Sequence, residues 1–440
     1  MPYILLAVLT VTVAFAVVRS GGVSHTEQNF FLFPLALAAI AAALFLPRIK
    51  PRRLSPVYRW LLPILPAVAI FQLLPLPASW VVALSPARSQ GIAALSGMGV
   101  ASPNATITVY PTATRDYILL ICAYIVIFLI VRQLTGAFSD RLWILILPLL
   151  LIGVWETVVA LIQAAAGTIV AGNYVNRNHF SGLLEMLLPF AAVWPLAHFR
   201  TGYERRELST ADGLKIGIAW TLAALFLIVV ILSQSRMGFI TCMFALLVAG
   251  VLVVLTKRHA LPNRRSVYLL LGGVAIVIGL ALVTLPTGEL IQRFGDATVS
   301  IRKDGTPEAS RYAMWRETIQ LIKTYPWLGC GVGGYFAAYT PFKHTDPQFT
   351  VDRAHNDYLQ ILAEFGIPTG LVVFVLAGFT LWNSIRRAFA AKRADSWVLA
   401  IASTASLAAI ALHSTVDFNL YIPANAMVLC WVAALSTYGT

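Results

Sequence analysis

The stretch VYLLLGGVAIVIGLALVTL, residues 267–285, contains no charged side chain, and LVVFVLAGFTLW at 371–382 continues into apolar flanks. A helix needs about 20 predominantly apolar residues to cross the hydrocarbon core of a bilayer. A strand of a membrane β-barrel would instead show about ten residues of alternating hydrophobicity. These continuous runs therefore predict membrane-spanning α-helices.

The composition of the whole chain agrees with this prediction. Of the 440 residues, 59% are hydrophobic and only 12% are charged, whereas soluble globular proteins carry about 25% charged residues. The composition therefore excludes an ordinary soluble protein, and it is neither polar nor repetitive enough for a disordered chain, a collagen or a coiled coil. We predict an all-α polytopic membrane protein.

About twelve segments are long enough to span a membrane. Their centres lie near Val8, Ala38, Ala67, Ala123, Gly153, Phe190, Ala224, Leu246, Val277, Val373, Thr404 and Leu429. The first segment, Pro2–Val18, has no basic region before it, so we expect a retained helix rather than a cleaved signal peptide. The predicted spans divide the chain into three regions. They are an N-terminal bundle at 1–286 with spans 1–9 and a loop at about 78–115, a large loop at 287–354, and spans 10–12 at 355–440.

The basic residues predict the orientation of these spans. Of the 32 Lys and Arg residues, 19 fall in the short links after the even-numbered spans, near 48–59, 132–141, 200–215, 257–265 and 386–393. By the positive-inside rule, both termini and these links lie in the cytoplasm, and both long loops lie outside. Much of the net charge of +13 is thus topological, and we predict no nucleic-acid partner.

The second long loop is predicted to contain a helix that covers the bundle. Thr306 and Pro307 are suitable N-cap and first helical residues, and Trp315, Ile319 and Ile322 recur with helical spacing. Arg311 precedes Trp315 by four residues and is expected on the same stripe. Pro326–Gly329 would end the helix, and Cys330, the only one of four cysteines in a polar loop, is expected to react with a thiol reagent if that loop is exposed.

Two arginines are candidate binding residues. Arg236, in Ser233–Gly238 between two apolar runs, must lie at or just inside the external interface, where an anionic partner would offset the cost of placing Arg near hydrocarbon. The alternative is that Arg236 extends to lipid phosphates. Arg311 is the second candidate, and the alternative there is packing over Trp315.

His355 is the candidate catalytic residue. It lies in Ala354–Gln360, where the loop is predicted to re-enter the membrane. His355, Tyr358, Leu359 and Leu362 share one helical face, with Asn356 on the adjacent one. We predict His355 in the first turn of a helix, where the helix dipole favours the neutral imidazole that a general base needs. The alternative is a helix cap.

The stretch Asn176–Gly182 is a further candidate for sugar or phosphate contacts. It is polar and external, and a plain turn with an N-cap is an equally good interpretation. Glu156 and Glu185 lie in spans and need partners, for which structural pairing is the better interpretation. His413 and Asp417, near the turn after span eleven, have weaker claims. The candidate substrate contacts are Asn176, Arg177, Asn178, His179, Asn356 and Tyr358.

Motifs for metals and nucleotides are missing from the sequence. Residues 329–334 satisfy G-x-G-x-x-G, but a dinucleotide site needs a strand before it and a helix after it, and here the glycines are better explained by tight turns. No metal-ligand spacing, P-loop or acidic cluster is present. We therefore expect an enzyme that uses no metal and no cofactor.

Together, these motifs resemble the O-antigen ligase/polymerase superfamily of bacterial membrane glycosyltransferases. The resemblance extends over roughly 170–385 and rests on the order and predicted sidedness of five short motifs. They are Asn-Arg-Asn-His-Phe-Ser-Gly at 176–182, Ser-x-Ser-Arg at 233–236, Arg311-x-x-x-Trp315, Pro-Trp-Leu-Gly-x-Gly at 326–331, and His-Asn-Asp-Tyr-Leu-Gln at 355–360 with Glu364 and Gly366.

The resemblance implies a GT-C-like fold in the bacterial inner membrane and a periplasmic active site. Such enzymes transfer a glycan from undecaprenyl diphosphate to an acceptor hydroxyl, on lipid A–core for a ligase or on another lipid-linked glycan for a polymerase. By resemblance, Arg236 and Arg311 bind the diphosphate and His355 activates the acceptor. Arg forks suit phosphate oxygens, and a single displacement would invert the anomeric carbon.

Other classes of membrane protein are less consistent with the sequence. A secondary transporter usually shows internal repeats, which are not evident here. A flippase for the same lipid would need external cations but no histidine beside them, and a structural scaffold would leave Arg236 without a purpose. Ligase and polymerase remain unseparated, as do the sugars and the oligomeric state.

Overall fold

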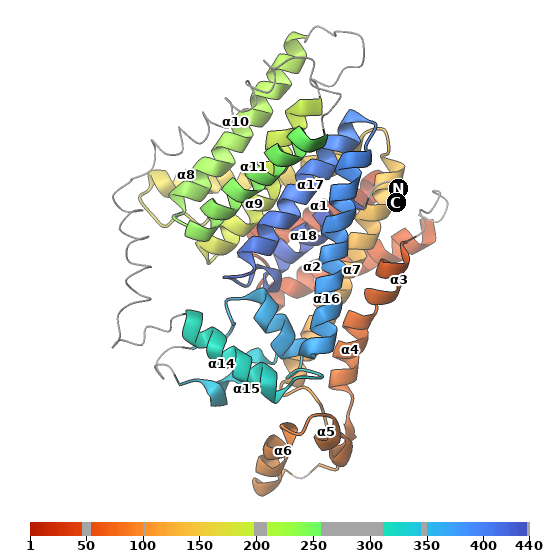
Figure 1. Cartoon of the computed structure of the whole chain (residues 1–440), viewed down its shortest axis with the longest axis vertical. Coiled ribbons are helices and arrows are strands. Elements are labelled where there is room, and N and C mark those ends of the chain that lie inside the picture. The colour runs from red at the N-terminus through yellow and green to blue at the C-terminus, as the bar shows by residue number, and fades with distance from the viewer. Residues whose placement is uncertain (46–53, 101, 198–208, 257–310, 345–349, 438–440) are drawn as a thin grey trace.

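The computed structural model describes residues 1–45, 54–100, 102–197, 209–256, 311–344 and 350–437 (Figure 1). The expected span near Val277 and the expected helix start at Thr306 and Pro307 lie outside these residues. Within them the chain is almost entirely helical, which confirms the all-α prediction.

Eleven of the twelve expected span centres fall in helices. These helices are α1 (Pro2–Val18), α2 (His25–Phe45), α3 (Pro56–Leu61) with α4 (Ile64–Leu73), α7 (Pro111–Ala137), α8 (Leu147–Ala165), α9 (Arg177–Val193), α10 (Thr210–Leu232), α11 (Arg236–Thr256), α16 (Asp357–Ala390), α17 (Ala394–His413) and α18 (Pro423–Ser436). In the described part of the chain, nine segments are long and apolar enough to cross a membrane, while α1 and α18 are shorter. The count of twelve is therefore not established. Short 3-10 turns are η2 (Leu142–Leu145), η3 (Trp194–Ala197), η4 (Thr340–Phe342) and η5 (Asn419–Tyr421).

Helices α9 and α17 form the centre of the bundle. Most residues of both are buried, and α17 packs against α9, α11, α16 and α18. The peripheral helix α2 instead exposes large apolar side chains at helical spacing, namely Phe30, Phe33, Leu37, Ile40 and Leu44. An apolar outer face of this kind is suited to lipid rather than water.

The two long loops meet at one end of the bundle (Figure 1). The first contains α5 (Ala78–Leu84), α6 (Arg88–Gly97) and a two-stranded antiparallel sheet of β1 (Leu76–Pro77) and β2 (Asn104–Ala105), with Leu76 opposite Ala105. The second contains α14 (Arg311–Thr324) and α15 (Tyr335–Tyr339). The backbone N–H of Val109 donates to the carbonyl of Cys330 at 2.9 Å, which joins the loops.

The helix expected in the second loop is confirmed over α14, but its expected buried stripe is wrong. The buried side chains are Met314, Glu317, Thr318, Leu321 and Ile322, whereas Ile319 is exposed. The reason is polar pairing under the helix: Glu317 accepts hydrogen bonds from the Tyr339 hydroxyl and from the backbone N–H of His344. Trp315 lies at the flank and donates from Nε1 to the carbonyl of Ala354 at 3.1 Å.

Helix α16 is broken at Gly366, and the segment at 326–334 packs into the break. Gly366 has φ 78°, and Pro368 follows it. Cys330 N–H donates to Ala363 O at 2.9 Å, and Ile367 N–H donates to Pro326 O at 2.8 Å. The glycine-rich stretch makes tight turns, as expected, with positive φ at 329, 331 and 333. Cys330 is completely buried there, so the reaction with a thiol reagent, which requires an exposed residue, is not expected of the folded protein.

Candidate active site

The candidate site is organised by Asp417, in the turn between α17 and η5. Its side chain is 1% exposed. The Phe418 backbone N–H donates to Asp417 Oδ1 at 2.9 Å, and the Asp357 N–H donates to the Asp417 carbonyl at 3.1 Å. The carboxylate is thus held by its own turn and by the start of α16.

Four side chains from three other parts of the chain converge on this carboxylate. His179 Nε2 and His355 Nδ1 each lie 3.6 Å from Oδ1. Arg311 Nη2 lies 3.9 Å from Oδ2, and Asn178 Nδ2 donates to Oδ2 at 2.8 Å. The histidine distances exceed a normal hydrogen bond but allow strong charge interaction in a buried setting.

The two histidines lie against the same aromatic ring. The centroids of His179 and His355 are 4.6 and 4.8 Å from that of Phe418, both in edge-to-face geometry. Such contacts fix ring orientation. Because His355 is 29% exposed and Arg311 41% exposed, both side chains can also meet a ligand.

The surroundings of Asp417 keep it ionised. Burial alone would raise the pKa of Asp417, but His179, His355 and His413 more than offset this effect and lower the pKa well below its usual range. The site therefore contains a permanent negative charge facing imidazoles and a guanidinium.

Arg236 is connected to this cluster through its neighbour Ser235. Ser235 Oγ donates to Asn178 Oδ1 at 2.9 Å, and the same Asn178 side chain donates to Asp417. Ser235 Oγ also accepts from the Gly238 N–H at 3.2 Å, so it is the N-cap of α11. Arg236, half-buried, is the first residue of that helix.

The position expected for His355 is wrong by two residues. Asn356 is the N-cap of α16, with its Oδ1 accepting from the Leu359 N–H at 3.0 Å, so the helix begins at Asp357. His355 precedes the helix with φ 46°, an unusual value for a residue other than glycine. The helix-dipole argument therefore does not apply to it, and its ring instead lies against Phe418 with Nδ1 3.6 Å from Asp417 Oδ1.

Two candidate substrate contacts bond to backbone instead. The Asn356 side chain, besides capping α16, donates to Thr415 O at 2.9 Å. The Tyr358 hydroxyl donates to Ala411 O at 2.7 Å.

The Asn176–Gly182 stretch combines both of its interpretations. Asn176 is the N-cap of α9, with its side chain accepting from the Asn178 N–H at 2.9 Å. Arg177, half-buried, is the first residue of that helix, and His179 is buried. The turn thus caps a helix and also delivers Asn178 and His179 to Asp417.

The buried glutamates of the spans have structural partners, as expected. Glu185 Oε2 lies 2.8 Å from His413 Nδ1, with both side chains fully buried, and it accepts from the Thr241 hydroxyl. Glu156 accepts from the backbone and side-chain amides of Asn173. His413 is also one of the charges that act on Asp417.

The central position of Asp417 was not predicted from the sequence. The sequence shows a carboxylate in a short link between apolar spans, which requires a cationic partner, but it does not show which residue is that partner. In the described residues, no group of three or more His, Cys, Asp and Glu is placed to hold a metal ion.

Fold and site together define a multi-pass helical membrane protein with a buried cluster of His, Arg and Asp side chains. Residues 221–375, about a third of the chain, match the family model described as O-antigen ligase. The match confirms the resemblance to the O-antigen ligase/polymerase family. The matched segment includes Arg236, Arg311 and His355. No curated protein matches the chain significantly.

Proposed function

We propose that the protein is a periplasmic, metal-independent, inverting glycosyltransferase of the O-antigen ligase type. Its donor is a glycan on undecaprenyl diphosphate, and its acceptor is a hydroxyl of lipid A–core. A ligase- or polymerase-type role in glycosyl transfer is supported by the family match. The observation that best supports this proposal is that His355 and Arg311 both approach Asp417. Hydrogen bonds through Asn178 and Ser235 also connect Asp417 to the start of α11.

The helix starts at the site favour an anionic ligand. Arg177 and Arg236 are the first residues of α9 and α11. The positive end of a helix dipole attracts an anion, and each of these helices begins with a guanidinium side chain that can also bind one. Helix N-termini and guanidinium groups both bind phosphate well. A diphosphate near Arg236 and Arg311 would interact with groups of both kinds.

His355 is the proposed general base. Its Nδ1 faces the Asp417 carboxylate, which favours the tautomer with the proton on Nδ1 and leaves Nε2 to accept a proton. The acceptor oxygen would lose its proton to Nε2 and bond to the anomeric carbon, while the bond from that carbon to the phosphate oxygen breaks. Undecaprenyl diphosphate leaves, and Arg236 and Arg311 would stabilise its developing charge.

Two alternative functions share this chemistry in part. A polymerase would use a second lipid-linked glycan as its acceptor and could have the same cluster. A flippase or transporter for the lipid-linked glycan would need the arginines but not a base oriented by a carboxylate. The contact between His355 and Asp417 therefore favours an enzyme over a transporter. We place this enzyme in the bacterial inner membrane with both termini in the cytoplasm.

A transfer assay with the purified protein tests the proposal. A defined polyprenyl-diphosphate glycan is offered with lipid A–core or with a second lipid-linked glycan, with and without EDTA. His355→Ala should slow transfer by about 10²–10⁴-fold and leave donor binding largely intact, while Arg236→Ala and Arg311→Ala should weaken donor binding.

His344→Ala is the matched control, because His344 is an exposed histidine of the same loop outside the Asp417 cluster. Normal turnover by His355→Ala would refute the assigned base, and activity abolished by EDTA would refute the metal-independent mechanism. Transfer only to the second lipid-linked glycan would favour the polymerase.

A further inference from the structure

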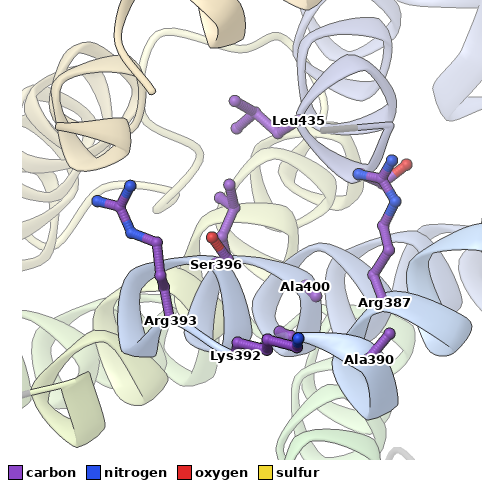
Figure 2. A pocket seen from close by; sticks show the side chains of 10 residues that line it. Arg387, Ala390, Lys392, Arg393, Ser396, Ala400 and Leu435 are labelled. Atoms are coloured by element: carbon purple, nitrogen blue, oxygen red, sulfur yellow. The ribbon is translucent and has the colours of Figure 1, made fainter. Parts of the chain in front are cut away.

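A cavity of about 270 Å³ is lined by residues outside the candidate active site (Figure 2). It is formed by the C-terminal end of α16, the beginning of α17 and the end of α18. Asp357 and His413, which adjoin the Asp417 cluster, are at the opposite ends of α16 and α17. The cavity is therefore a separate feature of the bundle.

Its charged lining is entirely basic in the described residues. Arg387, Lys392 and Arg393 line it, and no Asp or Glu does. Figure 2 shows Arg387 and Arg393 on two sides of the cavity, with Ser396 between them. Arg393 Nη1 lies 3.0 Å from Asp140, whose side chain is 85% exposed. Three basic side chains thus line the cavity, one of which is paired with an exposed carboxylate.

Apart from Ser396 and Ser436, the remaining wall is apolar. Leu399 and Ala400 of α17 and Leu435 of α18 contribute to it. On the outside of the same end of α16, Trp382 and Phe389 are exposed, and such aromatic residues are typical of the level where lipid headgroups begin. A basic opening above an apolar wall at this level matches an amphiphile with an anionic head.

We propose that this cavity binds the phosphate headgroup of an anionic phospholipid. Arg387 and Arg393 would hold the phosphate oxygens, as guanidinium groups do, Lys392 would add charge, and the lipid glycerol region would lie against Leu399 and Leu435. Basic pockets between membrane helices are suited to such headgroups. Inorganic phosphate has the same phosphate oxygens as the lipid but no apolar portion, so it is the alternative ligand for this cavity.

The test measures lipid binding to the full-length purified chain. Delipidated protein is titrated with phosphatidylglycerol or phosphatidylcholine in detergent micelles, and a separate arm uses inorganic phosphate. We expect the wild type to prefer phosphatidylglycerol. Near a membrane surface each basic residue contributes to anion attraction, so removing one cation should weaken the affinity about fivefold and removing two roughly thirtyfold.

The variants are Arg387→Gln with Arg393→Gln, and Lys392→Gln alone, because Lys392 is exposed and its substitution should not impair folding. Arg386→Gln is the matched control: it removes the same charge one residue away, outside the cavity lining. Equal lipid binding by the wild type and the cavity variants would overturn the proposal, as would an equal loss in Arg386→Gln. Binding of inorganic phosphate that depends on Arg387 and Arg393, with no preference among lipids, would keep the anion site but assign it to free phosphate.

Discussion

At the scale of single residues, the candidate site is built around one carboxylate, that of Asp417. A buried charge is tolerated only when partners compensate for its lost hydration, and Asp417 obtains them from three distant parts of the chain: His179, Arg311 and His355. Each partner alone has an ordinary structural explanation. Their meeting at Asp417 makes a positioning role for this residue the natural hypothesis.

Asp417→Asn should therefore slow glycan transfer by about 10²-fold or more, because carboxylates that orient catalytic histidines have large effects. The measurement is the transfer rate beside donor affinity, and Asp140→Asn, an exposed carboxylate, is the control. Transfer at the wild-type rate in Asp417→Asn would contradict the role.

The lowered pKa of Asp417 also predicts how the stability of the folded protein depends on pH. Because the folded-state pKa of Asp417 is lowered, its ionised form stabilises the protein fully above the unfolded value of about 3.9. That contribution is lost as the pH falls below this value toward the folded pKa. The difference in thermal stability between wild type and Asp417→Asn should persist above about pH 4 and shrink in acid.

A second test at the scale of residues asks whether Asn356 serves as the N-cap of α16 or contacts the substrate. Because its Oδ1 caps α16, Asn356→Ser should keep both the helix start and transfer, while Asn356→Ala should lose about 1 kcal/mol of stability. Thermal unfolding and transfer rates of both variants decide the matter. A loss of transfer in Asn356→Ser at wild-type stability would show a direct substrate contact.

At the scale of elements, the second long loop, which we call the cap, is fixed to the bundle. Its backbone crosses that of α16 at Gly329 and Gly366. A Cβ added at Gly329 would lie 2.2 Å from the carbonyl oxygen of Glu364, and one at Gly366 would lie 2.3 Å from that of Trp327. Both glycines have positive φ. The cap and the broken helix α16 therefore approach each other at a distance that only glycine allows.

Gly329→Ala should consequently destabilise the protein. Its positive φ alone would cost about 1–2 kcal/mol, and the collision with the Glu364 backbone adds to this. Gly378→Ala is the control, because a Cβ there meets nothing within 4 Å and alanine favours a helix interior. Thermal unfolding in detergent measures both, and equal stabilities would contradict the close crossing.

At the scale of the whole molecule, the predicted sidedness is open to chemical labelling. Tyr312→Cys in α14 and Arg59→Cys in α3 place thiols at exposed positions, which the positive-inside rule assigns to opposite sides of the membrane. A membrane-impermeant maleimide should label the first only from the periplasmic side and the second only from the cytoplasmic side.

The unmodified protein supplies the background for this experiment. Burial raises the pKa of the Cys330 thiol, and the residue is inaccessible, so it should remain unlabelled from either side. Labelling of Tyr312→Cys only from the cytoplasmic side would invert the topology.

The sequence by itself determined the class of protein and most of its helices. Runs such as the one centred near Ala123 are long and apolar, and in lipid each backbone must satisfy its own hydrogen bonds, so local pattern is sufficient. It also identified Arg236, Arg311 and His355 as candidates.

Only the tertiary structure decided how these residues are used. The buried face of α14 depends on Glu317 pairing with Tyr339, which periodicity cannot reveal. The importance of Asp417 depends on partners far away in the chain. Hydropathy is a property of neighbours in sequence, whereas a buried charge is stabilised by neighbours in space, and those exist only once the chain has folded.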